Sequence, residues 1–302
     1  GDGANGGGCK LAIKAKRDEE GRKWKFDGVQ LERLFVKMDV AGMQLKGAIF
    51  IFDDDPTYGR GFAGAVGAKF TKGMKLEVEA TALFGRTDTF RYWFADAQVT
   101  MPTGIPIFTG FALNSFGGGF YNRMKMAGNT NKEDAAFNEI GASTSGVIYE
   151  PYEGNAFGMK ASIGIITQNS EDLFHATVEF GMAFKKSGGL QEIYFKGFGE
   201  LVAALPGDFY DVVGSNLSSI ASPDSPGIPA QQPSGAMSAN VFIGFDFVND
   251  KFHATSELYI NFGIVQGIGP AGRAGWLDFY VAPGEWHLLV GTPEDRVGIK
   301  VN

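Results

Sequence analysis

The sequence predicts an all-β chain of long antiparallel hairpins, arranged as a meander that forms one strongly curved sheet or open barrel. Glycine is abundant, at 44 of 302 residues, and charged residues make up only 20% of the chain, against a usual share of about 25%. Several segments alternate apolar and polar residues with a period of two, which is typical of strands with two different faces. We expect about 12 to 14 strands, a number at which a sheet must curl or close.

The clearest strand signal is at residues 75–84. Its apolar positions, Leu76, Val78, Ala80 and Ala82, alternate with Lys75, Glu77, Glu79 and Thr81. The segment before it places Phe62, Val66, Ala68 and Phe70 on one side. Because the connection between the two segments is short, we predict a hairpin.

The same plan occurs twice more, which predicts degenerate internal repeats. The second and third hairpins are expected at 157–184 and 241–262, and aromatic strands follow the three hairpins at 90–101, 190–205 and 274–283. We therefore expect a single β-rich domain, 1–302, with repeat units at about 43–101, 157–205 and 239–302. The stretch 215–238 is rich in Ser, Pro and Gly, which predicts a flexible insertion. Short helices are expected at 131–137 and 208–213, and 29–38 fits either helix or strand.

A repeated polar row is the most distinctive candidate site. The stretch "LFHATVEFGMAF" is echoed by "KFHATSELYINF", and period two puts two matching sets on one face: His175, Thr177 and Glu179, then His253, Thr255 and Glu257. His and Glu four residues apart on a strand are about 13 Å apart, too far to share one metal ion. We expect the apolar face to be buried and this row to lie on the wet exterior. The alternative is that the row lines a groove for a polar ligand.

Cofactor signals are few. Asp53, Asp54 and Asp55 close an apolar strand and precede Pro56, so they are a candidate calcium site, with a solvated turn as the alternative. Two G-x-G-x-x-G matches, at 59–64 and 267–272, are expected by chance in so glycine-rich a chain, and both lead into strands, where nucleotide binding needs a helix. H-E-x-x-H and G-x-S-x-G motifs are absent. We predict no catalytic residues and no cofactor other than calcium.

Charge, cysteine content and the first residues exclude several classes of partner and structure. The net charge of -7, with no long basic block, excludes nucleic acid as a partner. The single cysteine, Cys9, excludes an intramolecular disulfide, and no apolar run of about 18 residues predicts a membrane helix. The first residues, "GDGANGGGCK", lack Met and an apolar leader, so we expect an internal piece of a longer protein.

Two segments carry a family resemblance. The segments "LDFYVAPGEWHLLVGTPEDRVGIKV" and "FRYWFADAQVTMPTGIPIFTGFALNSFGGGFY" resemble parts of very large β-rich cell-surface or secreted proteins of the Bacteroidota group, some of them TANFOR-type. The resemblance covers about half of the chain and includes Gly291-Thr292-Pro293 ahead of a strand. It implies an extracytoplasmic scaffold or adhesion-type role in a longer parent chain, and it supplies no catalytic residues.

These observations favour a non-enzymatic structural or binding segment of a large extracytoplasmic protein, at the cell surface or secreted. Its expected partners are the rest of the parent chain or other envelope proteins. The alternative is a porin-like outer-membrane β-barrel, which suits the high glycine content, the low charge and the acidic pI, and it makes membrane association a second expectation. A glycan-active enzyme or carbohydrate-binding module is the third hypothesis. Most of the strand aromatics are expected in the core, but any that face outward suit a binding surface; the candidates are Trp93, Trp276, Trp286, Tyr92, Tyr194, Tyr259 and Tyr280.

Overall fold

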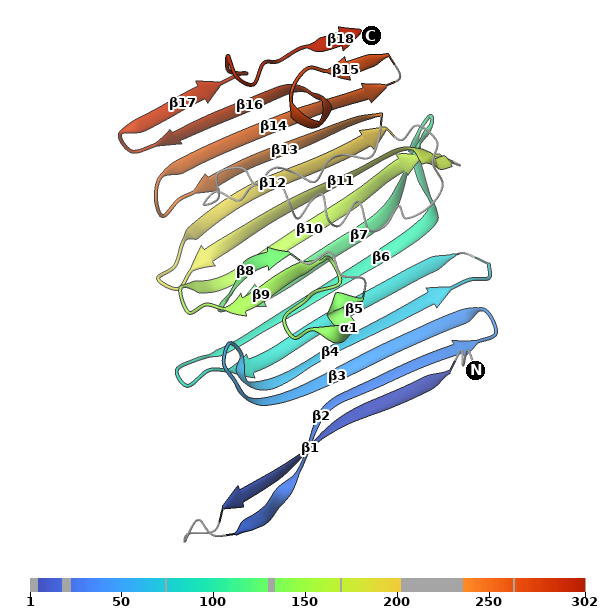
Figure 1. The fold of residues 1–302 in the computed structure, drawn as a ribbon, viewed down its shortest axis with the longest axis vertical. Coiled ribbons are helices and arrows are strands. Elements are labelled where there is room, and N and C mark those ends of the chain that lie inside the picture. Colours follow the sequence, from blue (N-terminus) through green and yellow to red (C-terminus); the bar gives the residue numbers. More distant parts are fainter. Residues whose placement is uncertain are drawn as a thin grey trace.

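The fold is a long antiparallel sheet, as the sequence predicts (Figure 1). The computed structural model describes residues 5–17, 23–73, 75–129, 134–168, 170–201, 236–262 and 264–301. Within these ranges, 16 strands form one sheet and β8 and β9 form a separate two-stranded sheet. The sheet is open, and β1 and the C-terminal strands lie at its opposite ends (Figure 1). The all-β meander is therefore confirmed, with more strands than expected.

The strands follow the chain in order, each hydrogen-bonded to the next with few exceptions. Their bounds are β1 (Gly6–Arg17), β2 (Trp24–Val40), β3 (Met43–Asp55), β4 (Gly59–Phe70), β5 (Leu76–Arg86), β6 (Arg91–Phe108), β7 (Phe111–Asn122), β8 (Met124–Asn129), β9 (Val147–Pro151), β10 (Asn155–Thr167), β11 (Ser170–Lys185), β12 (Leu190–Leu201), β13 (Met237–Asp246), β14 (Lys251–Phe262), β15 (Val265–Gly267), β16 (Arg273–Ala282), β17 (Glu285–Leu289) and β18 (Ile299–Val301). A helix α1 (Ala135–Asn138) and a 3-10 turn η1 (Pro270–Gly272) complete the described elements.

The three predicted hairpins are present as β4–β5, β10–β11 and β13–β14. Residues 29–38 belong to the long strand β2. Residues 135–137 of the helix predicted at 131–137 lie in α1, and residues 131–133 lie outside the described residues. The helix expected at 208–213 and most of the insertion expected at 215–238 lie outside the described residues.

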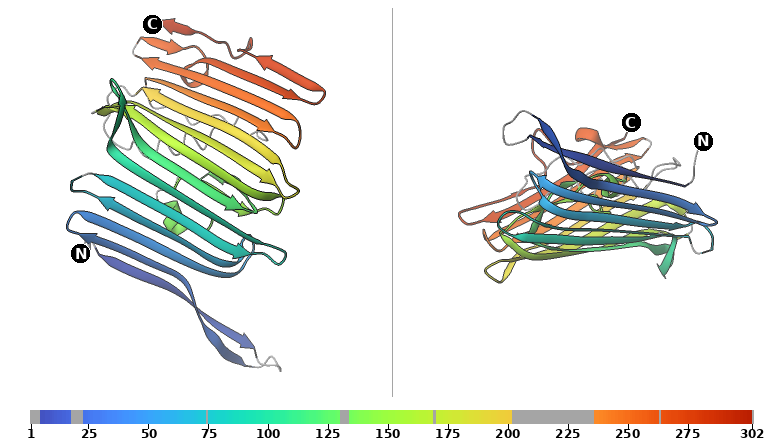
Figure 2. Two further views of the ribbon diagram at one scale, coloured as in Figure 1. Left: turned by 180° about the vertical axis from the view of Figure 1, so that it is seen from behind. Right: turned by 90° about the horizontal axis from the view of Figure 1, so that it is seen from below.

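A small unit covers one face of the sheet. We call residues 124–151 the cap, because β8, β9 and α1 lie over the middle of the sheet (Figures 1 and 2). The main hydrophobic core lies between the cap and the sheet, and it includes Phe50, Phe52, Leu83, Phe94 and Tyr121 from the sheet and Met124, Phe137, Val147 and Tyr149 from the cap. The face under the cap is named the capped face, and the opposite one the bare face. Among the described residues, no helix is long and apolar enough to cross a membrane.

Glycines opposite tyrosines determine the packing of the capped face. Gly158 pairs directly with Tyr121, and Gly181 pairs with Tyr194. The phenol rings lie so close over the glycines that a Cβ on Gly158 would be 2.0 Å from Tyr121 Cζ, and one on Gly181 would be 2.3 Å from Tyr194 Cζ. Each ring therefore needs a neighbour without a side chain, which accounts for part of the high glycine content.

Gly158→Ala should destabilise the fold by about 1–3 kcal/mol, because the new methyl group overlaps the Tyr121 ring. Gly64→Ala is the matched control. Its Cβ would meet only the Ala48 carbonyl, at an ordinary 3.6 Å. The control should be neutral or gain up to about 1 kcal/mol, since glycine is unfavourable inside a strand. Chemical denaturation measures both, and equal effects would contradict the proposed packing.

Candidate functional site: a buried charge cluster and a bare apolar face

The polar row, which was expected at the surface, is largely buried, and the apolar face, which was expected to be buried, is exposed. In the polar row, His175, Glu179 and His253 are buried, with relative exposures of 3%, 6% and 5%. On the other face, Phe180 and Phe245 are 39% and 44% exposed. The expected wet exterior for the polar row is therefore wrong. Large side chains of neighbouring strands, together with the cap, close over the capped face, where the row lies.

The histidines of the row contact carboxylates of neighbouring strands. His175 Nε2 lies 3.4 Å from Glu200 Oε2, and His253 Nε2 lies 2.9 Å from Asp278 Oδ1. Thr177 is buried and Thr255 is half-buried. Glu257 accepts hydrogen bonds from Arg273 at 2.7 Å and from the Tyr259 hydroxyl at 3.1 Å. Members of the row thus contact partners on neighbouring strands, namely Glu200, Asp278 and Arg273.

A buried charge cluster forms around Lys160 on β10. Its ammonium lies 3.2 Å from Asp96 Oδ2 on β6 and 3.8 Å from Glu179 Oε2 on β11, and the lysine side chain is only 3% exposed. Tyr194 on β12 donates a hydrogen bond to Glu179 at 3.0 Å. Strand β7 lies between β6 and β10. The β7 residue that pairs with both Asp96 and Lys160 is Gly119, which has no side chain, so Asp96 and Lys160 meet across it. A Cβ on Gly119 would be 2.7 Å from Asp96 Oδ2.

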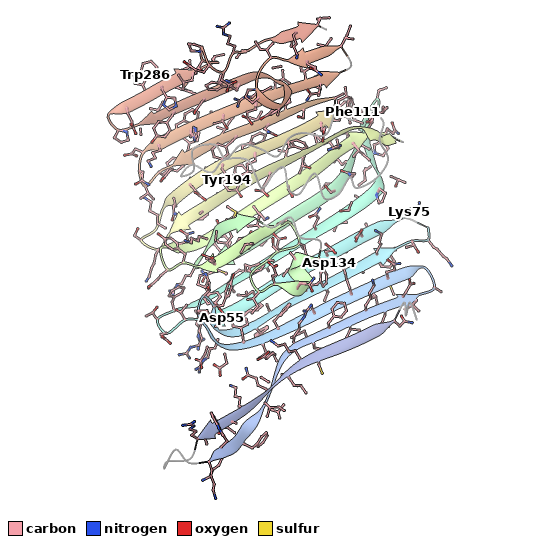
Figure 3. The ribbon with its side chains drawn as sticks, in the orientation of Figure 1. Asp55, Lys75, Phe111, Asp134, Tyr194 and Trp286 are labelled. Atoms are coloured by element: carbon pink, nitrogen blue, oxygen red, sulfur yellow. The ribbon has the colours of Figure 1, made fainter. Side chains whose placement is uncertain are left out.

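The cluster also binds the cap. Thr144 and Ser145 donate hydrogen bonds to the two Asp96 carboxylate oxygens, at 2.8 and 3.2 Å, and Lys160 donates one to Ser145. A second ionic contact lies beside α1, where Lys46 Nζ is 2.7 Å from Asp134 and 2.6 Å from Glu79 (Figure 3 labels Asp134). The charges of Asp96 and Lys160 are buried, and pairing offsets the cost of removing them from water, whereas Lys46 and Asp134 lie partly at the surface, with side-chain exposures of 27% and 45%. The two contacts therefore define one position for the cap.

The acidic run Asp53–Asp55 makes contacts within the turn between β3 and β4. Asp55 Oδ1 accepts backbone hydrogen bonds from Thr57 and Tyr58, at 2.9 and 2.8 Å, and Asp53 lies 3.2 Å from Arg60 Nε. Asp54 has a positive φ of 66°. In the described part of the chain, no group of three or more His, Cys, Asp or Glu residues is arranged to hold a metal ion. Calcium binding by this run stays a prediction.

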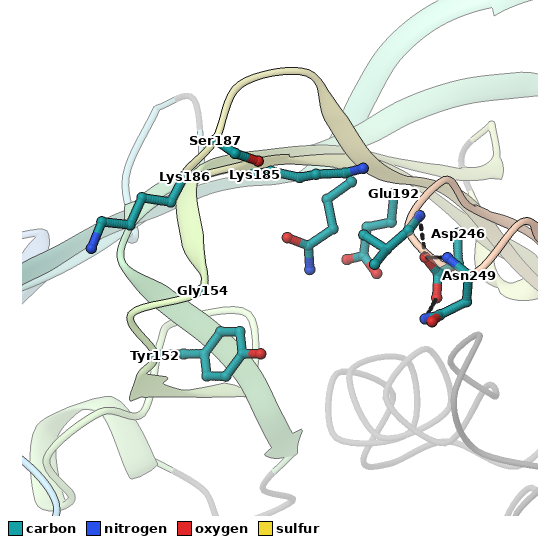
Figure 4. Close-up of a pocket in the computed structure, with 10 residues that line it drawn as sticks. Tyr152, Gly154, Lys185, Lys186, Ser187, Glu192, Asp246 and Asn249 are labelled. Carbon is teal, nitrogen blue, oxygen red and sulfur yellow. Dashed lines mark hydrogen bonds between the residues drawn. The ribbon is translucent and has the colours of Figure 1, made fainter.

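A cleft of about 600 Å³ lies at the strand ends, lined by residues of the β9–β10, β11–β12 and β13–β14 connections (Figure 4). Asp246 lines it, but its carboxylate accepts hydrogen bonds from the backbone of Val248 and Asn249, at 2.8 and 3.1 Å, so it stabilises the turn. Lys186 pairs with Glu153 at 2.6 Å. These polar groups are therefore engaged within the protein.

The bare face is uncharged across the whole width of the sheet. Cross-strand pairs connect one continuous row through Cys9, Leu34, Ile49, Gly64, Ala82, Ala95, Phe120, Met159, Met182, Ile193, Phe245, Phe252, Val281 and Trp286. The adjacent row on the same face runs through Gly7, Val36, Gly47, Val66, Ala80, Ala97, Gly118, Ala161, Phe180, Phe195, Ile243, Ala254, Phe279 and Leu288. Neither row contains a charged or hydrogen-bonding side chain, apart from the Trp286 indole and the Cys9 thiol.

The uncharged band on this face has a defined height. On β4 it extends from Phe62 to Phe70, about 27 Å of extended chain, and Arg60 lies beyond it on the same face. Aromatic rings gather near that end, where Phe62 stacks on Phe84 at 5.3 Å and Phe84 stacks on Trp93 at 6.4 Å. Val66, in the middle of the band, is 61% exposed. The described part of the sheet thus carries a charge-free band with aromatic rings at one border.

Sequence reasoning identified Glu179 but missed Asp96 and Lys160, and it considered Tyr194 only as part of an outward-facing aromatic surface, whereas its side chain is buried. The available signal was a charged residue at an inward position beside glycines, as in Gly158-Met159-Lys160.

No protein-family model matches the chain, and neither the search of curated proteins nor that of solved structures returned a match. The function is therefore argued from the two faces of the sheet.

Lys160→Met should cost about 3–5 kcal/mol of stability, because it leaves the buried carboxylates of Asp96 and Glu179 without their cation. The control is Lys186→Met, since Lys186 pairs with Glu153 at the surface, with side-chain exposures of 52% and 48%. The control should cost less than about 1 kcal/mol. Chemical denaturation distinguishes the two, and a small effect at Lys160 would contradict the role of the cluster.

Stability should also fall at high pH through Tyr58, which lies in the turn between β3 and β4. Burial, with the nearby charges of Glu150 and Asp55, raises the pKa of Tyr58 to about 12. Its hydroxyl donates a 3.0 Å hydrogen bond to the Tyr149 carbonyl of the cap. Because the pKa of Tyr58 is higher in the folded state than in the unfolded state, its neutral hydroxyl stabilises the fold fully below about pH 10, the unfolded pKa. This stabilisation is lost as the pH rises from about 10 to about 12. Tyr58→Phe should lack this part of the pH dependence when both chains are denatured across that range.

Proposed function

We propose that this chain is a membrane-embedded structural segment of a cell-envelope protein, with the bare face against lipid and the capped face turned away from it. The observation that carries the proposal is the continuous pair of uncharged rows from β1 to β17. The proposal retains the non-enzymatic extracytoplasmic role expected from the sequence and favours its outer-membrane alternative.

The size of the bare face argues against water as its neighbour. Its fourteen strands, β1–β7, β10–β14, β16 and β17, lie about 4.8 Å apart, which gives a width of about 60 Å. With a band about 27 Å high, the apolar area is about 1,600 Å². The largest apolar patch of a typical soluble monomer is about 300–600 Å². A face several times larger favours a non-aqueous neighbour.

The shape of the band favours lipid over another protein. Membrane-spanning sheets use tilted strands of about 9–11 residues, an apolar band about 25 Å tall and aromatic residues at both borders. β4, β5 and β13 have 12, 11 and 10 residues, and Phe62, Phe84 and Trp93 lie at one border. A standard protein interface covers only about 800 Å² of each partner and has a polar rim. The height of the band on β4, about 27 Å, matches that of a bilayer's apolar core.

Val66→Arg should destabilise the lipid-inserted chain by about 2–4 kcal/mol, because it puts a charge in the middle of the band. Val40→Arg is the matched control: Val40 lies on the same face at a strand end and is 47% exposed, so its cost should be about 0–1 kcal/mol. Unfolding in vesicles measures both. If the face were in water, both changes would fall within about 0.5 kcal/mol.

Flotation supplies the direct test. The purified chain should need detergent to stay monodisperse and should float with phospholipid vesicles in a density gradient. A chain that is monodisperse in plain buffer and stays at the bottom of the gradient would contradict the proposal.

A further inference from the structure

The main sheet has a long unpaired edge. Within the described residues, β1 pairs only with β2, so about half of the backbone N–H and C=O groups of its 12 residues point away from the sheet. At the far end, among the described strands, the five-residue strand β17 pairs only with β16, and the three-residue strand β18 pairs only with β15. Figure 1 shows the two strands at opposite ends of the sheet, and Figure 3 labels Trp286 on β17.

These edges conflict with a lipid environment. In water an unpaired edge is hydrated, and lysines such as Lys10, Lys14 and Lys16 on β1 prevent it from pairing with other molecules. In the hydrocarbon core, each unsatisfied backbone group costs several kcal/mol. A segment that lies in lipid, as the proposed function states, therefore needs a strand along β1.

The direction of β17 fits this need. Neighbouring strands along the path from β1 to β14 and on through β16 to β17 are all antiparallel. The path contains fourteen strands. Because this number is even, β1 and β17 run in opposite directions and can pair in the same antiparallel way as every other neighbour.

The faces of the two edge strands also match. The uncharged row that begins at Cys9 ends at Trp286, so both residues lie on the bare face. Alternation places Leu11 and Ile13 on the bare face of β1 and Leu288 on that of β17, while Lys10 and Lys14 lie on the opposite face of β1, and Glu285 and His287 on that of β17. Pairing the two edges would continue the apolar face without interruption.

Charge argues against the β1 strand of a second copy as the neighbour of β1. Two β1 strands paired with each other would bring Lys10, Lys14 and Lys16 of both chains together on one face, and like charges opposite one another are destabilising. We infer that β1 pairs with β17 of the same chain in the membrane, which closes the fourteen strands around the cap. The inference rests on the proposed lipid-facing function and specifies the contact that completes it.

Photo-crosslinking tests this pairing without knowledge of its register. Leu288 is replaced by benzoylphenylalanine, the chain is reconstituted into phospholipid vesicles, and the floating fraction is irradiated and mapped by mass spectrometry. We expect adducts with residues 6–17, beside those with the known neighbour β16. The same replacement at Phe195, which pairs with Phe180 and Ile243, is the control and should give adducts with β11 and β13 and none with β1. Trp286 provides a second site on β17 if the Leu288 variant does not fold.

An equal mixture of unlabelled and nitrogen-15 chains separates the outcomes. Adducts between β17 and β1 should join peptides of one isotope. Mixed-isotope adducts would overturn the inference in favour of pairing between copies, and adducts confined to β16 and lipid would overturn it in favour of an open edge. A chain that does not float would overturn the proposed function first, and the closure with it.

Discussion

The register of the antiparallel backbone hydrogen bonds is the constraint on which the rest of this structure depends. Because side chains alternate between faces, a slip of one residue in any pair would move every later residue to the wrong face. The row from Cys9 to Trp286 keeps one side through thirteen successive pairings. Tyr121 over Gly158 and Tyr194 over Gly181 help to maintain it, since only glycine leaves room for the ring.

The capped face shows what this register makes possible. Asp96, Lys160 and Glu179 come from three strands and meet in one buried cluster because the strands are aligned and Gly119 leaves the intervening position empty. Burying three charges is costly, and their mutual pairing with hydroxyl donors from Thr144 and Tyr194 offsets that cost. An apolar contact alone would allow the cap to slide, whereas directional hydrogen bonds to Asp96 restrict it to one position.

The two faces also reverse the arrangement of an ordinary soluble sheet. Such a sheet buries its apolar side and hydrates its polar side. Here the apolar side carries the exposed Phe180 and Phe245, while His175 and Glu179 are buried. Small residues (Ala97, Gly118, Ala161) and large rings (Phe180, Phe195) share one cross-strand row in the middle of the bare face, so its side chains differ in size but are all apolar.

The sequence by itself determined the all-β class, the three repeated hairpins and the face of the residues within them, since period-two alternation is a local property of segments such as Leu76–Arg86. It also placed His175, Thr177 and Glu179 together on one face. Only the tertiary structure decided which face is covered, because alternation separates two faces without stating which of them meets solvent. It alone brought Lys160 to Asp96, since that contact depends on which distant strands become neighbours and on a glycine between them, and neither fact is contained in a local pattern.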